Sequence, residues 1–150
     1  MIKVLFICHG NICRSPMGEF ILKDMVRKRG IADDFHIESA ATSYEEIGNP
    51  VYPPARRELN SHGINCEGHS ARHMEKRDYD NFDIIIGMDS ANMRNMQREF
   101  GGDPDGKLHK MLEYTGEGGD VADPWYTGEF GTTYRQVKAG CEALLEELGF

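Results

Sequence analysis

A short apolar segment that runs directly into a turn and then into a helix start constrains this chain most. Residues 4–7 (Val-Leu-Phe-Ile) are all apolar, which is typical of a strand buried on both faces of a parallel sheet. The turn Cys8–Ser15 follows, and Ser15 and Pro16 are predicted to be the cap and first residue of a helix. Strand, turn and helix in this order indicate an α/β fold.

The rest of the chain continues the alternation of strands and helices. Apolar spacing predicts helix 16–29, strand 35–40, helix 54–62, strand 82–88, helix 91–100, strand 108–114 and helix 134–148. Such crossovers are right-handed, so we expect one domain, residues 1–150, with an open parallel sheet flanked by helices on both faces. Ligands of these sheets bind beyond the carboxyl ends of the strands, where Cys8 stands.

The charge balance limits the partners. Asp and Glu total 25 against 17 Lys and Arg, a net charge of -8, so nucleic acid and anionic membranes would be repelled. No apolar run is long enough to span a bilayer. The four cysteines are scattered and the chain start does not resemble a secretory signal. We therefore expect a cytoplasmic protein, a monomer, with free thiols.

The turn itself (Cys-His-Gly-Asn-Ile-Cys-Arg-Ser) is suited to holding an oxyanion. Its backbone N–H groups and the helix start form an anion cradle, and Arg14 can hold two phosphoryl oxygens. A helix start and a nearby cation stabilise a thiolate, so Cys8 is predicted to attack phosphorus while Ser15 donates a hydrogen bond to its sulfur. The other predicted phosphate-binding residues are His9, Gly10, Asn11, Ile12 and Cys13.

Other interpretations of the turn compete with catalysis. A cysteine after a strand is more often a small buried apolar residue, and short motifs arise by chance. A nucleotide-binding Walker loop is excluded because Gly106-Lys107 is followed by Leu108, and no dinucleotide fingerprint follows the first strand. The flanking strand and helix start favour catalysis.

The segment Cys8–Ser15 resembles the signature loop of the low-molecular-weight protein tyrosine phosphatases. The similarity continues, in order, through Ser39–Thr42, Ile47–Pro50, His69–Arg72, Phe82–Asp83, Met88–Asp89 and Asp123–Tyr126. The resemblance implies a four-stranded parallel sheet, a cysteinyl-phosphate intermediate, and neither metal nor cofactor. It also implies tyrosine-phosphorylated proteins as substrates, and phosphate or vanadate as inhibitors.

Phosphotyrosine hydrolysis also needs an acid, because the leaving phenol has a pKa of about 10. Asp123 precedes Pro124 and the aromatic residues Trp125 and Tyr126, which are predicted to wall a flat substrate. Taken without the resemblance, Asp-Pro is more simply a turn. The resemblance assigns Asp123 as general acid and then as base; Asp120 is the second candidate.

Three polar residues match family positions that hydrogen-bond among themselves and brace the loop: Asn11, Ser39 and His69. The resemblance further implies that Cys13 forms a reversible disulfide with Cys8, which protects the nucleophile from irreversible oxidation.

The remaining cysteines and histidines are interpreted as structural. Cys66 and Cys141 are expected to pack in the interior, and His62 and His73 to lie at the surface or at helix ends. Without a clustered cysteine pair, we predict no zinc site.

The chain departs from the family pattern beside the site. Relatives commonly carry an aromatic residue two places before Ile-Gly-Asn-Pro, where this chain has Glu45, with Tyr44 one residue earlier. Tyr44 is therefore a candidate for the entrance wall. His9 replaces the leucine or threonine of many relatives and adds polarity there.

Related functions use the same scaffold. Arsenate reductases need a further cysteine pair near the third strand, and residues 82–89 contain none. Protein-arginine phosphatases have threonine where this chain has Ile12. A phosphate-binding or redox-sensing module, or a sulfur-carrying enzyme, would not require Asp123. We therefore predict phosphotyrosine hydrolysis, with the cellular substrate left open.

Overall fold

The computed structural model describes residues 1–150 and contains one four-stranded parallel sheet in the order β2-β1-β3-β4. The strands are β1 (Ile2–Cys8), β2 (Phe35–Ala41), β3 (Ile84–Gly87) and β4 (Leu108–Lys110). β1 lies inside the sheet between β2 and β3. The predicted open parallel sheet is confirmed.

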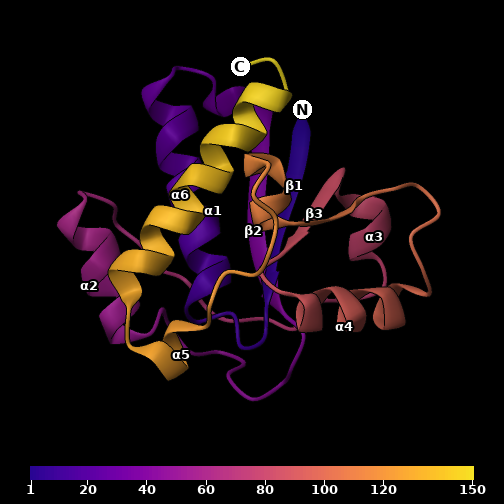
Figure 1. Cartoon of the computed structure of the whole chain (residues 1–150), viewed down its shortest axis with the longest axis horizontal. Helices are drawn as coiled ribbons and strands as arrows, with labels where there is room; N and C mark the ends of the chain where they lie inside the picture. The colour runs from indigo at the N-terminus through magenta and orange to yellow at the C-terminus, as the bar shows by residue number, and fades with distance from the viewer.

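Helices cover both faces of the sheet. They are α1 (Arg14–Lys28), α2 (Pro53–Ser61), α3 (Asp78–Asn81), α4 (Ser90–Phe100), α5 (Pro124–Thr127) and α6 (Phe130–Glu147), with 3₁₀ turns η1 (Ala32–Asp34) and η2 (Met111–Thr115). Helices α1, α2 and α6 lie on one side of the strands, and α3 and α4 on the other (Figure 1). None of the helices is long and apolar enough to cross a membrane.

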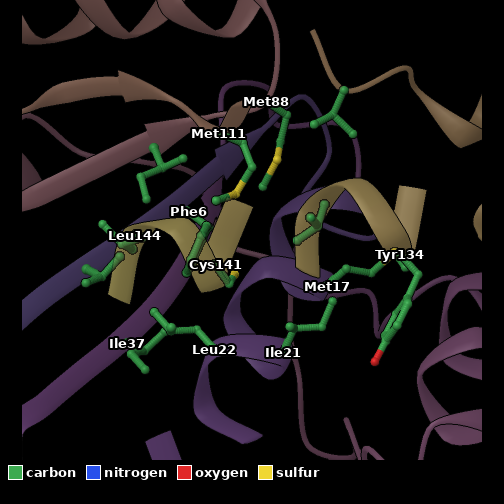
Figure 2. Close-up of a cluster of buried hydrophobic side chains, with 14 of the residues drawn as sticks. Phe6, Met17, Ile21, Leu22, Ile37, Met88, Met111, Tyr134, Cys141 and Leu144 are labelled. Atoms are coloured by element: carbon green, nitrogen blue, oxygen red, sulfur yellow. The ribbon is translucent and has the colours of Figure 1, made fainter. Parts of the chain in front are cut away.

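The apolar run of β1 supplies both cores. Val4 and Phe6 face the larger core under α1 and α6, whereas Leu5 and Ile7 face the smaller core under α4; all four are fully buried. Figure 2 shows Phe6 in the larger core with Met88, Met111, Cys141 and other labelled residues. Burial on both faces explains why this strand shows no alternation of apolar and polar residues.

Helix α1 lies against β1 at close range, and a glycine makes this possible. A Cβ atom at Gly18 would lie 2.6 Å from Cδ1 of Phe6, closer than side chains approach. The helix therefore starts directly beyond the carboxyl end of β1. The connecting loop, residues 9–13, is held between a buried strand and a helix packed on it.

Several sequence predictions about elements were wrong in detail: the third strand is Ile84–Gly87 and not 82–88, and α3 was not predicted. The fourth strand covers only Leu108–Lys110, because the chain then turns into η2 and buries Met111 and Leu112. Met111 lies against Gly140 of α6, where an added Cβ would be 2.6 Å from its Cε. The last helix begins at Phe130, earlier than the predicted 134, and α5 was not predicted.

The start of α1 also differs from the prediction. The helix begins at Arg14 after Cys13, and no side chain caps it. Ser15 lies inside the first turn, where its hydroxyl contacts other residues of the loop. Pro16 is accordingly the third helical residue and not the first.

Candidate active site

A cavity opens beyond the carboxyl end of β1, the place expected for parallel sheets. Its lining comes from three segments: Cys8, His9, Gly10, Ile12, Cys13 and Arg14 of the loop, Glu45 and Glu46 after β2, and Asp123, Trp125 and Tyr126 around the start of α5. The structure thus gathers the predicted nucleophile, arginine and acid around one cavity.

The thiol of Cys8 lies at the buried end of this cavity. Its Sγ is 3.0 Å from the Ser15 hydroxyl oxygen and accepts a longer, 3.4 Å contact from the Ser15 backbone N–H. Cys8 is only 3% exposed. Two donors from the first turn of α1 are therefore available to a thiolate.

Asn11 ties the loop to its surroundings. Its Nδ2 donates to Ser15 Oγ (2.8 Å) and Ser39 Oγ (2.9 Å), and its Oδ1 accepts from the Arg72 backbone N–H (3.1 Å). Its carbonyl oxygen lies 2.7 Å from His69 Nε2. The three predicted bracing residues thus meet around one completely buried asparagine.

The conformation of Asn11 is also unusual. Its φ of 59° is the only positive value among the non-glycine residues. Asparagine tolerates the left-handed region better than most residues, and here its side chain compensates with three hydrogen bonds. The backbone of the loop is thereby held in a curled shape.

Arg14 connects the loop to two other segments. Nη1 donates to Asp89 Oδ2 (2.7 Å) and to the Val121 carbonyl (2.9 Å), and Nη2 lies 3.5 Å from Asp123 Oδ2. Burial opposes the charge of Arg14, but Cys8, Asp89 and Asp123 outweigh it and raise the pKa of the guanidinium. A permanent cation is therefore fixed beside the thiol.

Asp123 stands opposite the loop at the start of α5. Its Oδ1 accepts the Trp125 backbone N–H (3.1 Å), so the carboxylate caps this short helix. Trp125 packs against Tyr52, with ring centroids 4.8 Å apart, and Tyr126 is largely exposed. The extended residue before Pro124 and the two aromatic rings lie where a planar substrate would enter.

The mouth of the cavity is more acidic than expected. His9 Nε2 lies 3.0 Å from Glu45 Oε2, and Glu46 accepts from Asn49 Nδ2 at 2.6 Å. Tyr44 does not line the cavity, because its ring stacks on His73 at 3.8 Å. Glu46 was missed as a lining residue, although its place directly before Ile-Gly-Asn-Pro signalled it.

The other cysteines differ from Cys8 in their surroundings. Cys13 lines the same cavity, and burial together with the nearby Cys8 raises the pKa of its thiol well above the ordinary value. Cys66 and Cys141 are buried away from the cavity, and burial raises the pKa of both thiols. All four cysteines are free in this structure.

Two residues that contribute to the site were missed. Asp89, which the sequence indicated only as part of the matching segment Met88–Asp89, both caps α4 and holds Arg14. Glu19 is buried and accepts from Ser39 Oγ at 2.5 Å, which extends the bracing network behind Asn11. An acid one helical turn after Ser15 was the available signal for Glu19.

Comparisons with known proteins agree with this geometry. The family model described as low molecular weight phosphotyrosine protein phosphatase matches residues 3–149. The chain is 38% identical to the low molecular weight protein-tyrosine-phosphatase YfkJ of Bacillus subtilis (strain 168), over 99% of this chain and 96% of that protein. It superimposes on the crystal structure of YfkJ with a TM-score of 0.95, covering 99% and 94% of the two chains.

Two further solved structures are similar over almost their full lengths. SP-PTP, a low molecular weight protein tyrosine phosphatase from Streptococcus pyogenes, is 40% identical with a TM-score of 0.90, covering 100% of this chain and 95% of that one. The Drosophila arginine phosphatase DARP is 31% identical with a TM-score of 0.89, covering 99% of each chain. The chain belongs to the low molecular weight phosphotyrosine protein phosphatase family.

Proposed function

We propose that this protein hydrolyses phosphotyrosine monoesters in proteins, through a phosphocysteine intermediate on Cys8. The observation that supports this most directly is that the Cys8 thiol, 3.0 Å from the Ser15 hydroxyl, lines one cavity with Arg14 and Asp123. Residues 1–150 act as one phosphatase domain in this proposal.

In the first step the Cys8 thiolate attacks phosphorus. An S–P bond forms and the P–O bond to the phenol breaks, while Arg14 and the loop N–H groups hold the other phosphoryl oxygens. Asp123 donates its proton to the leaving phenolate oxygen.

In the second step a water molecule completes hydrolysis. The Asp123 carboxylate takes a proton from water while the water oxygen attacks phosphorus. The S–P bond then breaks and inorganic phosphate is released. The Ser15 hydroxyl, 3.0 Å from Sγ, stabilises the departing thiolate. Phosphate and vanadate are expected to inhibit by occupying the same loop.

Cys13 belongs to this proposal as a redox partner. Both sulfurs face one cavity, and a mild oxidant would convert Cys8 to a sulfenic acid that condenses with Cys13 to a disulfide, releasing water. Peptide mass spectrometry after brief peroxide treatment tests this step. Absence of a linked Cys8–Cys13 peptide would contradict it.

We further infer a cytoplasmic monomer that acts on tyrosine-phosphorylated proteins. The net charge of -8 and the free cysteines support this setting. Gel filtration with light scattering tests the oligomeric state. Fractionation of the source cells tests the compartment.

A second candidate is phosphoarginine hydrolysis, which the likeness to the Drosophila arginine phosphatase favours. The decisive experiment compares phosphotyrosyl, phosphoseryl and phosphoarginyl versions of one peptide with the wild type and with Cys8→Ser. The apolar Ile12 at the cavity wall favours the aromatic substrate. A higher kcat/KM on phosphoarginine would overturn the tyrosine assignment while leaving the Cys8 mechanism intact.

A further inference from the structure

The segment that leads to Asp123 is rich in glycine. Gly116, Gly118 and Gly119 all have positive φ, between 69° and 81°, and nothing lies within 4 Å of where their side chains would be. Such a segment loses more conformational freedom on ordering than an ordinary loop. Something outside the glycine-rich stretch must therefore fix the path of the chain before Asp123.

The side chain of Asp120 makes the first fixed contact after the glycines. Its Oδ1 accepts from the Ser90 backbone N–H (3.1 Å), the Ser90 hydroxyl (3.1 Å) and Lys110 Nζ (2.9 Å). Lys110 Nζ also donates to Ser90 Oγ at 3.3 Å. Lys110 is the last residue of β4 and Ser90 the first of α4, so the contact joins two elements to the loop.

Buried backbone contacts follow directly. The Val121 N–H donates to the Met88 carbonyl (2.9 Å) and the Val121 carbonyl accepts from Arg14 Nη1 (2.9 Å). The contacts of Asp120 and Val121 together determine where residues 122 and 123 stand relative to Arg14. Asp120 itself does not line the cavity.

The charge on Asp120 agrees with this arrangement. The hydrogen bond from Lys110, followed by those from Ser90, lowers the pKa of the Asp120 carboxyl, so it is ionised throughout the neutral range. The Lys110 and Asp120 side chains are partly exposed, so their ion pair alone contributes little to global stability. We expect the ion pair to affect the position of the loop instead.

We propose that Lys110, Ser90 and Asp120 form a latch that positions Asp123 to protonate the leaving group. None of the three touches the substrate; they are positioning residues that act through the chain between Asp120 and Asp123. This proposal rests on the proposed role of Asp123 as general acid. Displacement of an acid by about 1 Å is enough to lower its efficiency strongly.

The latch has a kinetic signature that a merely structural contact lacks. General acid catalysis matters most when the leaving group is a poor one and least when it departs easily. We therefore compare kcat/KM, which reports the steps up to release of the phenol, on phenyl phosphate, whose phenolate is a poor leaving group, and on 4-nitrophenyl phosphate. Asp120→Ala should lower kcat/KM about three- to tenfold on the first and less than about twofold on the second.

Two further variants grade the effect. Asp120→Asn keeps an oxygen that can accept from Ser90 but loses the charge, so its kcat/KM on phenyl phosphate should lie between those of wild type and Asp120→Ala. Lys110→Met removes only the cation and should resemble Asp120→Asn. Glu117→Ala is the matched control, because this exposed acid lies in the same loop and is held only through its backbone N–H, which donates to Thr115 Oγ1 and is kept in the variant.

A second readout does not depend on activity. Trp125 is the only tryptophan in the chain and follows Asp123 by two residues. Its fluorescence in Asp120→Ala should be quenched more strongly by acrylamide than in wild type, with Glu117→Ala unchanged. Circular dichroism melting confirms that each variant is folded before it is compared.

The outcomes separate the two proposals. Equal loss of kcat/KM on both substrates, or no loss in Asp120→Ala, would overturn the latch. If Asp123→Asn itself shows no dependence on the leaving group, the general acid assignment fails as well. If Asp123→Asn shows that dependence and Asp120→Ala does not, only the latch is wrong.

Discussion

Two loops meet at the cavity, and they are held in place by different means. The phosphate loop (residues 8–14) is largely buried, and its Asn11 side chain bonds to buried Ser15 and Ser39 and to the Arg72 backbone. The acid loop (residues 116–123) is glycine-rich and largely exposed, and is held by residues of β4 and α4. The nucleophile therefore has a rigid support and the acid a weaker one.

This difference follows what each loop must do. A thiolate and an anion cradle need donors in fixed positions, and buried hydrogen bonds supply them. The acid must approach substrate and water in turn, which a loop with few buried contacts permits. The predictions below test how far this contrast extends.

The largest expected effect is at Cys8. Cys8→Ser should lower kcat on a phosphotyrosyl peptide by about 10⁴-fold or more, because the hydroxyl is a far weaker nucleophile at this position. Steady-state kinetics measures the loss. Calorimetry should still detect inorganic phosphate in the loop, and turnover near the wild-type rate would refute the mechanism.

Substitution of Asp123 should have the next largest effect on activity. Asp123→Asn is expected to lower kcat on phosphotyrosine by roughly 10²–10⁴-fold, because the amide cannot donate the proton. Asparagine is also a good helix cap, so α5 and the thermal midpoint should change little. A loss of activity explained entirely by unfolding would contradict this assignment.

Asn11 tests the rigidity of the phosphate loop. Asn11→Ala removes three side-chain hydrogen bonds and leaves a Cβ-bearing residue at φ 59°, which should lower the free energy of unfolding by about 2–3 kcal/mol. Asn11→Gly removes the same hydrogen bonds but suits the positive φ, so it should lower the free energy of unfolding by less. Urea denaturation measures both, and equal losses would show that backbone strain contributes nothing.

The two cysteines of the phosphate loop should differ in reactivity. Iodoacetamide at neutral pH is expected to alkylate Cys8 at least about tenfold faster than Cys13, because the donors of Ser15 stabilise the Cys8 thiolate. Burial raises the pKa of Cys13, so its alkylation should remain slow even when the pH exceeds 9.0, the ordinary pKa of a thiol. Mass spectrometry of the digested protein reads both sites, and preferential labelling of Cys13 would contradict this.

The smallest effects concern the aromatic residues around the mouth. Trp125→Ala should raise KM for a phosphotyrosyl peptide about threefold or more, because its ring lines the cavity. Tyr44→Ala should change KM less, since Tyr44 stacks on His73 instead. Steady-state kinetics with the peptide measures KM for both variants. A larger rise in KM for Tyr44→Ala than for Trp125→Ala would show that the Tyr44 ring reaches the substrate.

Much of the fold could be predicted because its signals are local. The apolar run 4–7 identified a strand buried on both faces, and the long helices α1 and α6 each had a repeating apolar stripe. The fourth strand was overestimated because Met111 and Leu112 are apolar for another reason. They pack into the core from η2, and an apolar residue does not reveal from which element it packs.

The site could be predicted in part, and with help from a family resemblance. Cys8 and Arg14 lie in one turn, so their meeting follows from local chain geometry. The position of Asp123 rested on similarity, because a residue so distant in sequence can be brought to Cys8 only by the whole fold. Ser15 was assigned correctly to the sulfur and wrongly to the helix cap.

The sequence by itself determined the sheet type, the loop that carries the thiol and the cation beside it. These depend on hydrophobic periodicity and on neighbours within one turn. Only the tertiary structure decided that Asp89 and Val121 hold Arg14, that Tyr44 turns to His73, and that Asp120 is tied to Lys110 and Ser90. Such contacts join residues far apart in the chain, and their geometry exists only once the sheet has brought its strand ends together.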